Sequence, residues 1–218
     1  MSEVFISYKQ EERERMRPIA DALRALKVEV WFDEKLAPDK PFTEEIEAVV
    51  NSCRAQVVCW SPAAVRSEWV RGEAEIGRQR QTLVQVMTEP CTLPPPFNMI
   101  HAENLSEWSG APEHTGWQKV LDAIGRRIGR LGLAELAMIQ GSPDGEAWKK
   151  WAAQYPTDPC AEEAWAKAET FHLSAERERL AKEWQVARKR AEEAEAKRRA
   201  TEEARRAATP QPTQRYEP

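Results

Sequence analysis

The sequence contains no long apolar run. No segment approaches the roughly 18 consecutive apolar residues that a membrane-spanning helix needs. The residues after Met1 also lack the apolar core of a secretory signal. We therefore expect a soluble cytoplasmic protein without a membrane span.

Cysteine and histidine are scarce, and their spacing matches neither a disulfide framework nor a metal site. The four cysteines form no CxxC pair and do not group with any of the three histidines. We expect no zinc or other metal, and we expect Cys53 and Cys59 to be buried thiols beside an apolar strand. The net charge of -4 shows no excess of basic residues. This balance argues against direct binding to nucleic acid.

Short apolar runs alternate with helical patterns over the first three fifths of the chain. Such alternation predicts an α/β fold with a parallel sheet covered by helices on both faces. The expected strands are Val4–Ile6, Val28–Phe32, Ala55–Trp60, Leu83–Met87 and a short one within Ile100–Leu105. The helices between them should run from near Arg17 to Lys27, from Thr43 to about Asn51, from Ser67 to about Arg80, and from Thr115 to about Gly129.

The remainder of the chain differs in composition. We expect a domain over residues 1–132, a helical extension over 133–208 with one long charged helix from about 161, and a disordered C-terminus over 209–218. The larger apolar residues stop near Trp184, beyond which the helix face narrows to alanines, too weak a pattern for a leucine-type coiled coil. The extension should pack onto the domain or a second copy through Trp148, Trp151, Trp165 and Trp184. It is also a candidate docking site for an activating partner.

The helix predicted after the third strand carries a carboxylate beside an indole. Ser67 is a suitable N-cap, and Trp69 and Glu73 lie four residues apart, which places them on one helix face. Open α/β sheets bind ligands near the carboxyl ends of their strands, where this helix begins. The alternative is that Trp69 belongs to the core and Glu73 is solvated. Spacing alone favours that alternative.

Several motifs appear in an order that resembles a known family. The chain contains Phe5-Ile6-Ser7-Tyr8, Trp31-Phe32-Asp33 and Ser61-Pro62, followed by Ser67-Glu68-Trp69 with Glu73 four residues later, and then Asn104-Leu105-Ser106-Glu107-Trp108. Together these resemble a bacterial TIR (Toll/interleukin-1 receptor) domain. The resemblance implies a flavodoxin-like parallel sheet of about five strands, followed here by an α-helical tail.

The resemblance also implies an activity. Many TIR domains cleave NAD+ and release nicotinamide with ADP-ribose or a cyclic ADP-ribose isomer, and the residue matching their catalytic glutamate is Glu73. Tyr8, Lys9, Phe42 and Trp69 are then the candidates for substrate binding, although Tyr8 or Phe42 could instead be core and Lys9 a surface lysine. NAD+ would be the substrate, with no separate cofactor. The implied setting is bacterial immune signalling, such as antiphage defence, or virulence.

A second implication concerns assembly. TIR domains contact one another through a loop that here contains Asp33, Pro38, Asp39, Lys40 and Pro41, and it lacks the glycine usual in that loop. Self-association through TIR–TIR contacts is therefore expected. The competing function is a non-catalytic module that recruits other TIR proteins. Glu73 favours the enzyme, since an adaptor needs no carboxylate at that position.

Overall fold

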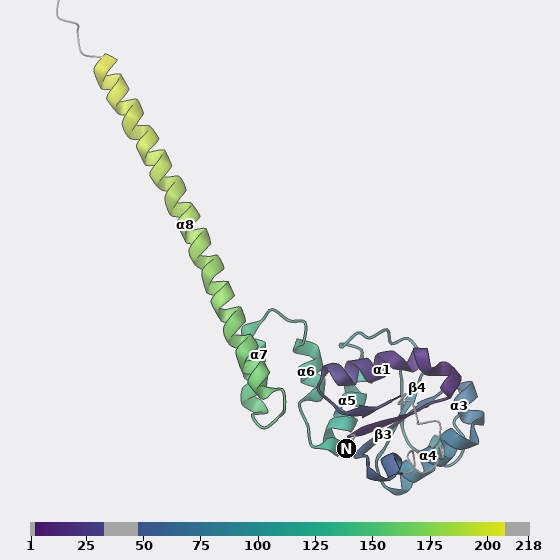
Figure 1. Ribbon diagram of the computed structural model, residues 1–218. Helices are drawn as coiled ribbons and strands as arrows, with labels where there is room; N and C mark the ends of the chain where they lie inside the picture. The colour runs from purple at the N-terminus through teal and green to yellow at the C-terminus, as the bar shows by residue number, and fades with distance from the viewer. Residues whose placement is uncertain (1–2, 33–47, 208–218) are drawn as a thin grey trace, which may run out of the picture. The chain divides into compact units, whose positions relative to one another are not determined.

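A five-stranded parallel sheet forms the centre of the protein (Figure 1). The structure is a computed structural model that describes residues 3–32 and 48–207. The strand order is β2-β1-β3-β4-β5, which confirms the expected flavodoxin-like sheet. The strands are β1 Val4–Ser7, β2 Val30–Trp31, β3 Ala55–Trp60, β4 Leu83–Met87 and β5 Ala102–Asn104.

The central strands are buried along their whole length, as expected for a parallel sheet covered on both faces. Every residue of β1 and β3 is buried. By contrast, β2 spans only Val30–Trp31 instead of the predicted Val28–Phe32. The amide of Val28 bonds to the carbonyl of Leu23 at 3.2 Å, so this residue completes the preceding helix end. In the described part of the chain β2 pairs with β1 alone.

Helices connect the strands, with α1 and α4 on opposite sides of the sheet (Figure 1). Residues 48–52 are helical, which confirms the end of the helix predicted from Thr43, whose start lies outside the described residues. The other helices are η1 Gln10–Glu12, α1 Arg13–Ala25, α3 Pro62–Arg66, α4 Glu68–Gln79, η2 Phe97–Met99, α5 Thr115–Ile128, α6 Leu133–Ile139, α7 Gly145–Gln154 and α8 Ala161–Ala207.

The start of α1 was predicted wrongly. It begins at Arg13, four residues before the expected Arg17, and keeps Pro18 inside. Pro18 removes one backbone donor. Two other interactions support this turn, since Met16 is completely buried and Arg17 donates to Glu14 at 2.9 Å.

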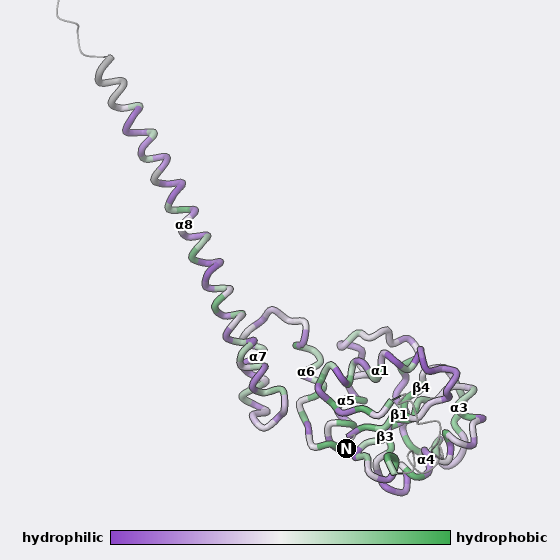
Figure 2. Tube along the Cα trace, viewed as in Figure 1, coloured by the Kyte–Doolittle hydropathy of each residue, from purple (hydrophilic) through white to green (hydrophobic). Residues whose placement is uncertain are grey.

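The chain divides into two compact units, Met1–Ala168 and Glu169–Pro218. The first contains α6, α7 and the first turns of α8, while the domain boundary expected at residue 132 stays a prediction. Trp148 and Trp151 are buried in this unit, as predicted, but Trp165 is 45% exposed. The long helix begins at Ala161 as expected. Hydropathy along the chain shows apolar strands and a mostly hydrophilic α8 (Figure 2).

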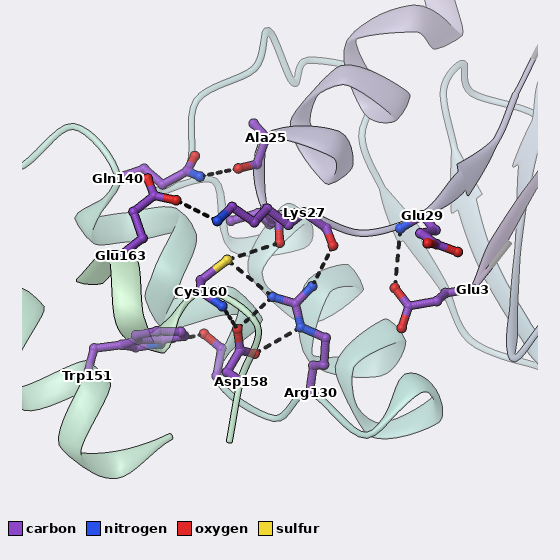
Figure 3. A network of polar contacts seen from close by, with 12 residues as sticks. Glu3, Ala25, Lys27, Glu29, Arg130, Gln140, Trp151, Asp158, Cys160 and Glu163 are labelled. Atoms are coloured by element: carbon purple, nitrogen blue, oxygen red, sulfur yellow. Dashed lines mark hydrogen bonds and ion pairs between the residues drawn. The ribbon is translucent and has the colours of Figure 1, made fainter. Parts of the chain in front are cut away.

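A buried ion pair ties the end of α5 to the segment before α8 (Figure 3). Arg130 donates to both carboxylate oxygens of Asp158, at 2.9 Å and 2.8 Å, and the two side chains are 6% and 4% exposed. Arg130 also donates to the carbonyl of Lys27 at 3.2 Å, and the amide of Cys160 donates to Asp158 at 2.9 Å. The pair thereby joins three segments that are distant in sequence.

Replacement of Asp158 by alanine should destabilise this unit strongly. The change leaves the Arg130 guanidinium buried without its counter-ion, which costs about 3–5 kcal/mol. Urea unfolding, followed by tryptophan fluorescence, measures the loss. The double variant Arg130→Met/Asp158→Leu removes both charges and should lose less stability than Asp158→Ala alone. A double variant at least as unstable as Asp158→Ala would contradict this account of the pair.

Candidate active site

Glu73 lies on the buried face of α4. The helix starts at Glu68 because the Ser67 hydroxyl accepts a hydrogen bond from the amide of Val70, as the sequence predicts. Val70 and Ala74 pack in the core on either side of Glu73 in sequence. Glu73 itself is only 8% exposed. The expectation of a solvated glutamate, favoured by spacing alone, is therefore wrong.

The carboxylate of Glu73 meets the end of the neighbouring strand. The Ser7 hydroxyl donates to Glu73 Oε2 at 2.5 Å, and Ser7 is the last residue of β1. α4 follows β3 through α3, and β1 and β3 are adjacent at the point where the strand order changes direction. Sheets of this kind bind ligands in the crevice at that point. The Ser7–Glu73 bond thus lies where this fold can hold a ligand.

The environment of Glu73 changes its acidity. Burial raises the pKa of Glu73 to about 6, and hydrogen bonds from the Ser7 hydroxyl and the Trp69 indole oppose that rise. With this pKa, roughly ten carboxylates are ionised for each protonated one at pH 7. The site therefore presents a carboxylate charge near neutral pH, although the carboxyl group is largely removed from water.

A buried glutamine fixes the position of α4. Gln56 lies in β3, is fully buried, and donates from its amide to the backbone carbonyl of Glu73 at 2.8 Å. Its side chain crosses the helix at Gly77, where an added Cβ would lie 2.4 Å from Gln56 Oε1. A larger residue at this position would require the Gln56 side chain or the helix to shift. Gln56 and Gly77 are positioning residues that we did not single out from the sequence, although one polar residue within an apolar strand was a usable signal.

The two aromatic candidates lie in different surroundings. Trp69 is 45% exposed and hydrogen-bonds Glu73 through its indole, so it is not a core residue. Tyr8 directly follows Ser7 and is partly buried, its ring 5.0 Å from that of Phe32. Burial raises the pKa of the Tyr8 hydroxyl, so Tyr8 stays neutral. The exposed indole of Trp69 thus lies one helical turn before Glu73, and the neutral phenol of Tyr8 directly follows Ser7 in the chain.

The remaining predicted residues contribute less to the described site. The Lys9 ammonium pairs with Glu11 at 3.3 Å at the surface, with the lysine side chain 37% exposed. The substrate-binding candidate Phe42 lies outside the described residues. So do all members of the predicted assembly loop, namely Asp33, Pro38, Asp39, Lys40 and Pro41. In the described ranges, no three His, Cys, Asp or Glu side chains gather as metal ligands.

A cavity of about 400 Å³ lies elsewhere, between β4, β5 and α5. Charged side chains from β5 and α5 line it, among them Glu103, Lys119 and Arg127. Neither Glu73 nor Ser7 lines this cavity. It is therefore separate from the candidate site.

Comparison with known protein families identifies the family of this chain. A sequence profile of the TIR domain matches residues 4–121, more than half of the chain. The chain belongs to the TIR domain family. No functionally curated protein matches it. None of the described helices is long and apolar enough to cross a membrane.

A solved TIR structure supports the same fold. The TIR domain of the Toll-related receptor TRR-2 from Hydra magnipapillata superposes with a TM-score of 0.51 and is 18% identical in sequence. The match covers 57% of this chain and 98% of the Hydra domain. At this identity the likeness establishes the fold alone. The Glu73 site must therefore be argued from its own geometry.

The raised pKa of Glu73 predicts how stability depends on pH. Because the folded pKa of about 6 exceeds the ordinary 4.5, the folded state favours the protonated form, and stability falls as pH rises from 4.5 to 6. Ionised Glu73 should cost about 2 kcal/mol at pH 7. Glu73→Gln should therefore be more stable than wild type at pH 7 and lose that advantage at pH 4. If urea unfolding showed the same pH dependence for the two proteins, the raised pKa of Glu73 would be refuted.

Proposed function

We propose that this TIR domain cleaves NAD+ between nicotinamide and ribose, with Glu73 as the catalytic residue. The observation that carries the proposal is the Glu73 carboxylate itself, bonded to Ser7 at the point where the strand order changes direction and to the half-exposed Trp69. The family resemblance contributes the reaction and Glu73 as its candidate residue, and the geometry adds the burial and the hydrogen bonds of that carboxylate.

The cost of Glu73 favours a functional role over a structural one. Its hydrogen-bond partners are a hydroxyl and an indole, and neither compensates its charge as a cation would. Burial disfavours the ionised form, so the residue weakens the fold at neutral pH. Groups with pKa values displaced by burial cluster at catalytic sites. A glutamine of the same shape would avoid the cost of ionisation, which argues that the charge serves the reaction.

The chemistry needs one carboxylate. Nicotinamide is bound to ribose as a cation, so it leaves as a neutral molecule with the electron pair of the broken C–N bond and needs no general acid. Positive charge develops on the ribose, and a carboxylate in a poorly solvated site stabilises it. Water then adds to give ADP-ribose and one proton. Capture of the ribose by an atom of the same molecule would give a cyclic product instead.

Ser7 tunes the acidity of the carboxylate in this scheme. Its hydroxyl donates to the charged form, which keeps the pKa of Glu73 below the value that burial alone would set. Trp69 combines an indole bond to Glu73 with an exposed ring face. An aromatic face of this kind can stack on a nucleobase or on nicotinamide. We assign it to substrate binding, together with Tyr8.

The cellular setting follows from the same proposal. The reaction would take place in the cytoplasm, where NAD+ is the substrate and no further cofactor is required. TIR domains mediate TIR–TIR interactions, and we propose that self-assembly activates the enzyme in bacterial immune signalling or virulence. An activating partner on the helical tail is compatible with this arrangement.

NAD+ cleavage should depend on ionised Glu73. Glu73→Gln should lower the release of nicotinamide by at least about 100-fold, since it keeps the shape and removes the charge. In wild type, kcat/KM should fall as pH drops through about 6, because protonation removes the same charge. Ser7→Ala removes a bond to the charged form and should move this inflection to higher pH. Nicotinamide release measured by chromatography from pH 5 to 8 tests all three.

Glu68→Gln is the matched control. Glu68 occupies the same helix but is exposed, so its removal should leave cleavage near the wild-type level. Cleavage that survives in Glu73→Gln would overturn the assignment of the catalytic residue. No cleavage by assembled wild-type protein would instead favour the non-catalytic module that recruits other TIR proteins.

A further inference from the structure

The middle of α8 carries a regular apolar stripe. Leu173, Leu180, Ala187 and Ala194 recur every seven residues, and Trp184 follows Leu180 by four. These are the intervals of the d and a positions of a heptad, with the first four residues at d and Trp184 at a. In a helix, all five lie along one face.

The large members of the stripe are exposed within the chain. Leu173, Leu180 and Trp184 are 51%, 53% and 62% exposed. The apolar surface of these side chains is removed from water only if a partner covers it. A helix without packing partners is also only marginally stable in water. The stripe therefore needs a partner that presents a matching apolar face along several helical turns.

The charges beside the stripe favour an identical helix as that partner. With Leu180 and Ala187 at d, Glu183 and Arg190 fall at g, whereas Arg188 and Glu195 fall at e. In a parallel, in-register pair of identical helices, each g residue faces the e residue five positions later on the other helix. Glu183 then meets Arg188, and Arg190 meets Glu195. Both levels pair opposite charges, and the sign reverses from one level to the next.

We propose that α8 forms a parallel two-stranded coiled coil with the α8 of a second copy of this chain. The apolar seam is too small for a leucine-type coiled coil, since the a positions beside Trp184 are Arg177 and Ala191, so the charges beside the seam must contribute to the pairing. The inference does not depend on the proposed NAD+ cleavage. Charge complementarity supports a second copy as the partner, since the g and e positions of this helix match those of an identical helix in the same register.

The contacts within one helix do not prevent this pairing. Arg188 bonds to Glu192 at 2.9 Å and lies 5.6 Å from the Trp184 ring, and Glu195 pairs with Arg199 at 2.5 Å. These side chains are exposed, and exposed pairs of this kind are weak. They can therefore accommodate an additional charge from a second helix.

A parallel coiled coil would bring the TIR domains of two chains into one dimer. In a parallel pair both chains enter the coiled coil from the same end, so the two TIR domains belong to one assembly and experience a raised local concentration. Contacts between TIR domains that are too weak in free solution gain from that tether. The dimer of α8 would thus support TIR–TIR association without forming part of it.

Disulfide trapping tests the register and the direction. Ala187→Cys places a thiol at a d position, where two identical residues of a parallel pair come within disulfide range. Lys189→Cys, at the outward f position, is the matched control. Under mild oxidation of the full-length chain, Ala187→Cys should give a linked dimer and Lys189→Cys should not. No linked dimer from Ala187→Cys, or equal linkage from both, would overturn the parallel arrangement.

Charge reversal tests the partner, with sedimentation equilibrium as the readout. Arg190→Glu alone and Glu195→Arg alone should each weaken self-association by roughly tenfold, because like charges then meet at two symmetric sites. An equimolar mixture of the two variants restores opposite charges between chains and should dimerise as well as wild type. Effects within one helix cannot produce this rescue. A wild-type chain that stays monomeric at its highest soluble concentration, or a mixture that shows no rescue, would refute the coiled coil.

Discussion

A carboxylate withdrawn from water is the constraint on which the site depends. Glu73 can remain charged at neutral pH only if donors replace part of its hydration, and the donor from the sheet is the Ser7 hydroxyl. That bond requires β1 to end at Ser7 and α4 to lie at a fixed height above the strand ends. Gln56 sets the height by bonding to the backbone of α4. The position of the Glu73 side chain therefore depends on three features: the strand order of the sheet, the end of β1 and the packing of α4 on β3.

Local patterns in the sequence predicted the elements well, because hydrophobic periodicity and helix caps are local properties. The parallel sheet, the Ser67 cap of α4 and the buried thiols Cys53 and Cys59 were all predicted and are confirmed. The errors have local causes that outweigh propensity. The helix α1 tolerates Pro18 because Met16 anchors the turn before it, and β2 is short because Val28 completes a helix end.

Contacts between distant residues could not be predicted. Ser7 and Glu73 are 66 residues apart, and Arg130 and Asp158 are 28 apart, so no spacing rule links either pair. The family resemblance supplied Glu73 as a candidate, but neither the motif nor the spacing showed that it would be buried. Trp69 was weighed as a core residue and proved half-exposed. The resemblance thus supplied the candidate carboxylate, whereas its hydrogen-bond partner and its supporting residues required the fold.

The close crossing at Gly77 has a consequence for how the protein tolerates change. Gly77 has no side chain to offer a ligand, and an alanine Cβ there would lie 2.4 Å from Gln56 Oε1, so either the glutamine side chain or the helix would have to shift. Glu73 lies one helical turn earlier, and its backbone carbonyl accepts the hydrogen bond from Gln56, so a shift of either Gln56 or the helix would reach Glu73. The candidate site is therefore linked to a residue without any functional group. Sensitivity at such a position reflects how closely the helix packs on the sheet. A search for reactive side chains would not find this residue.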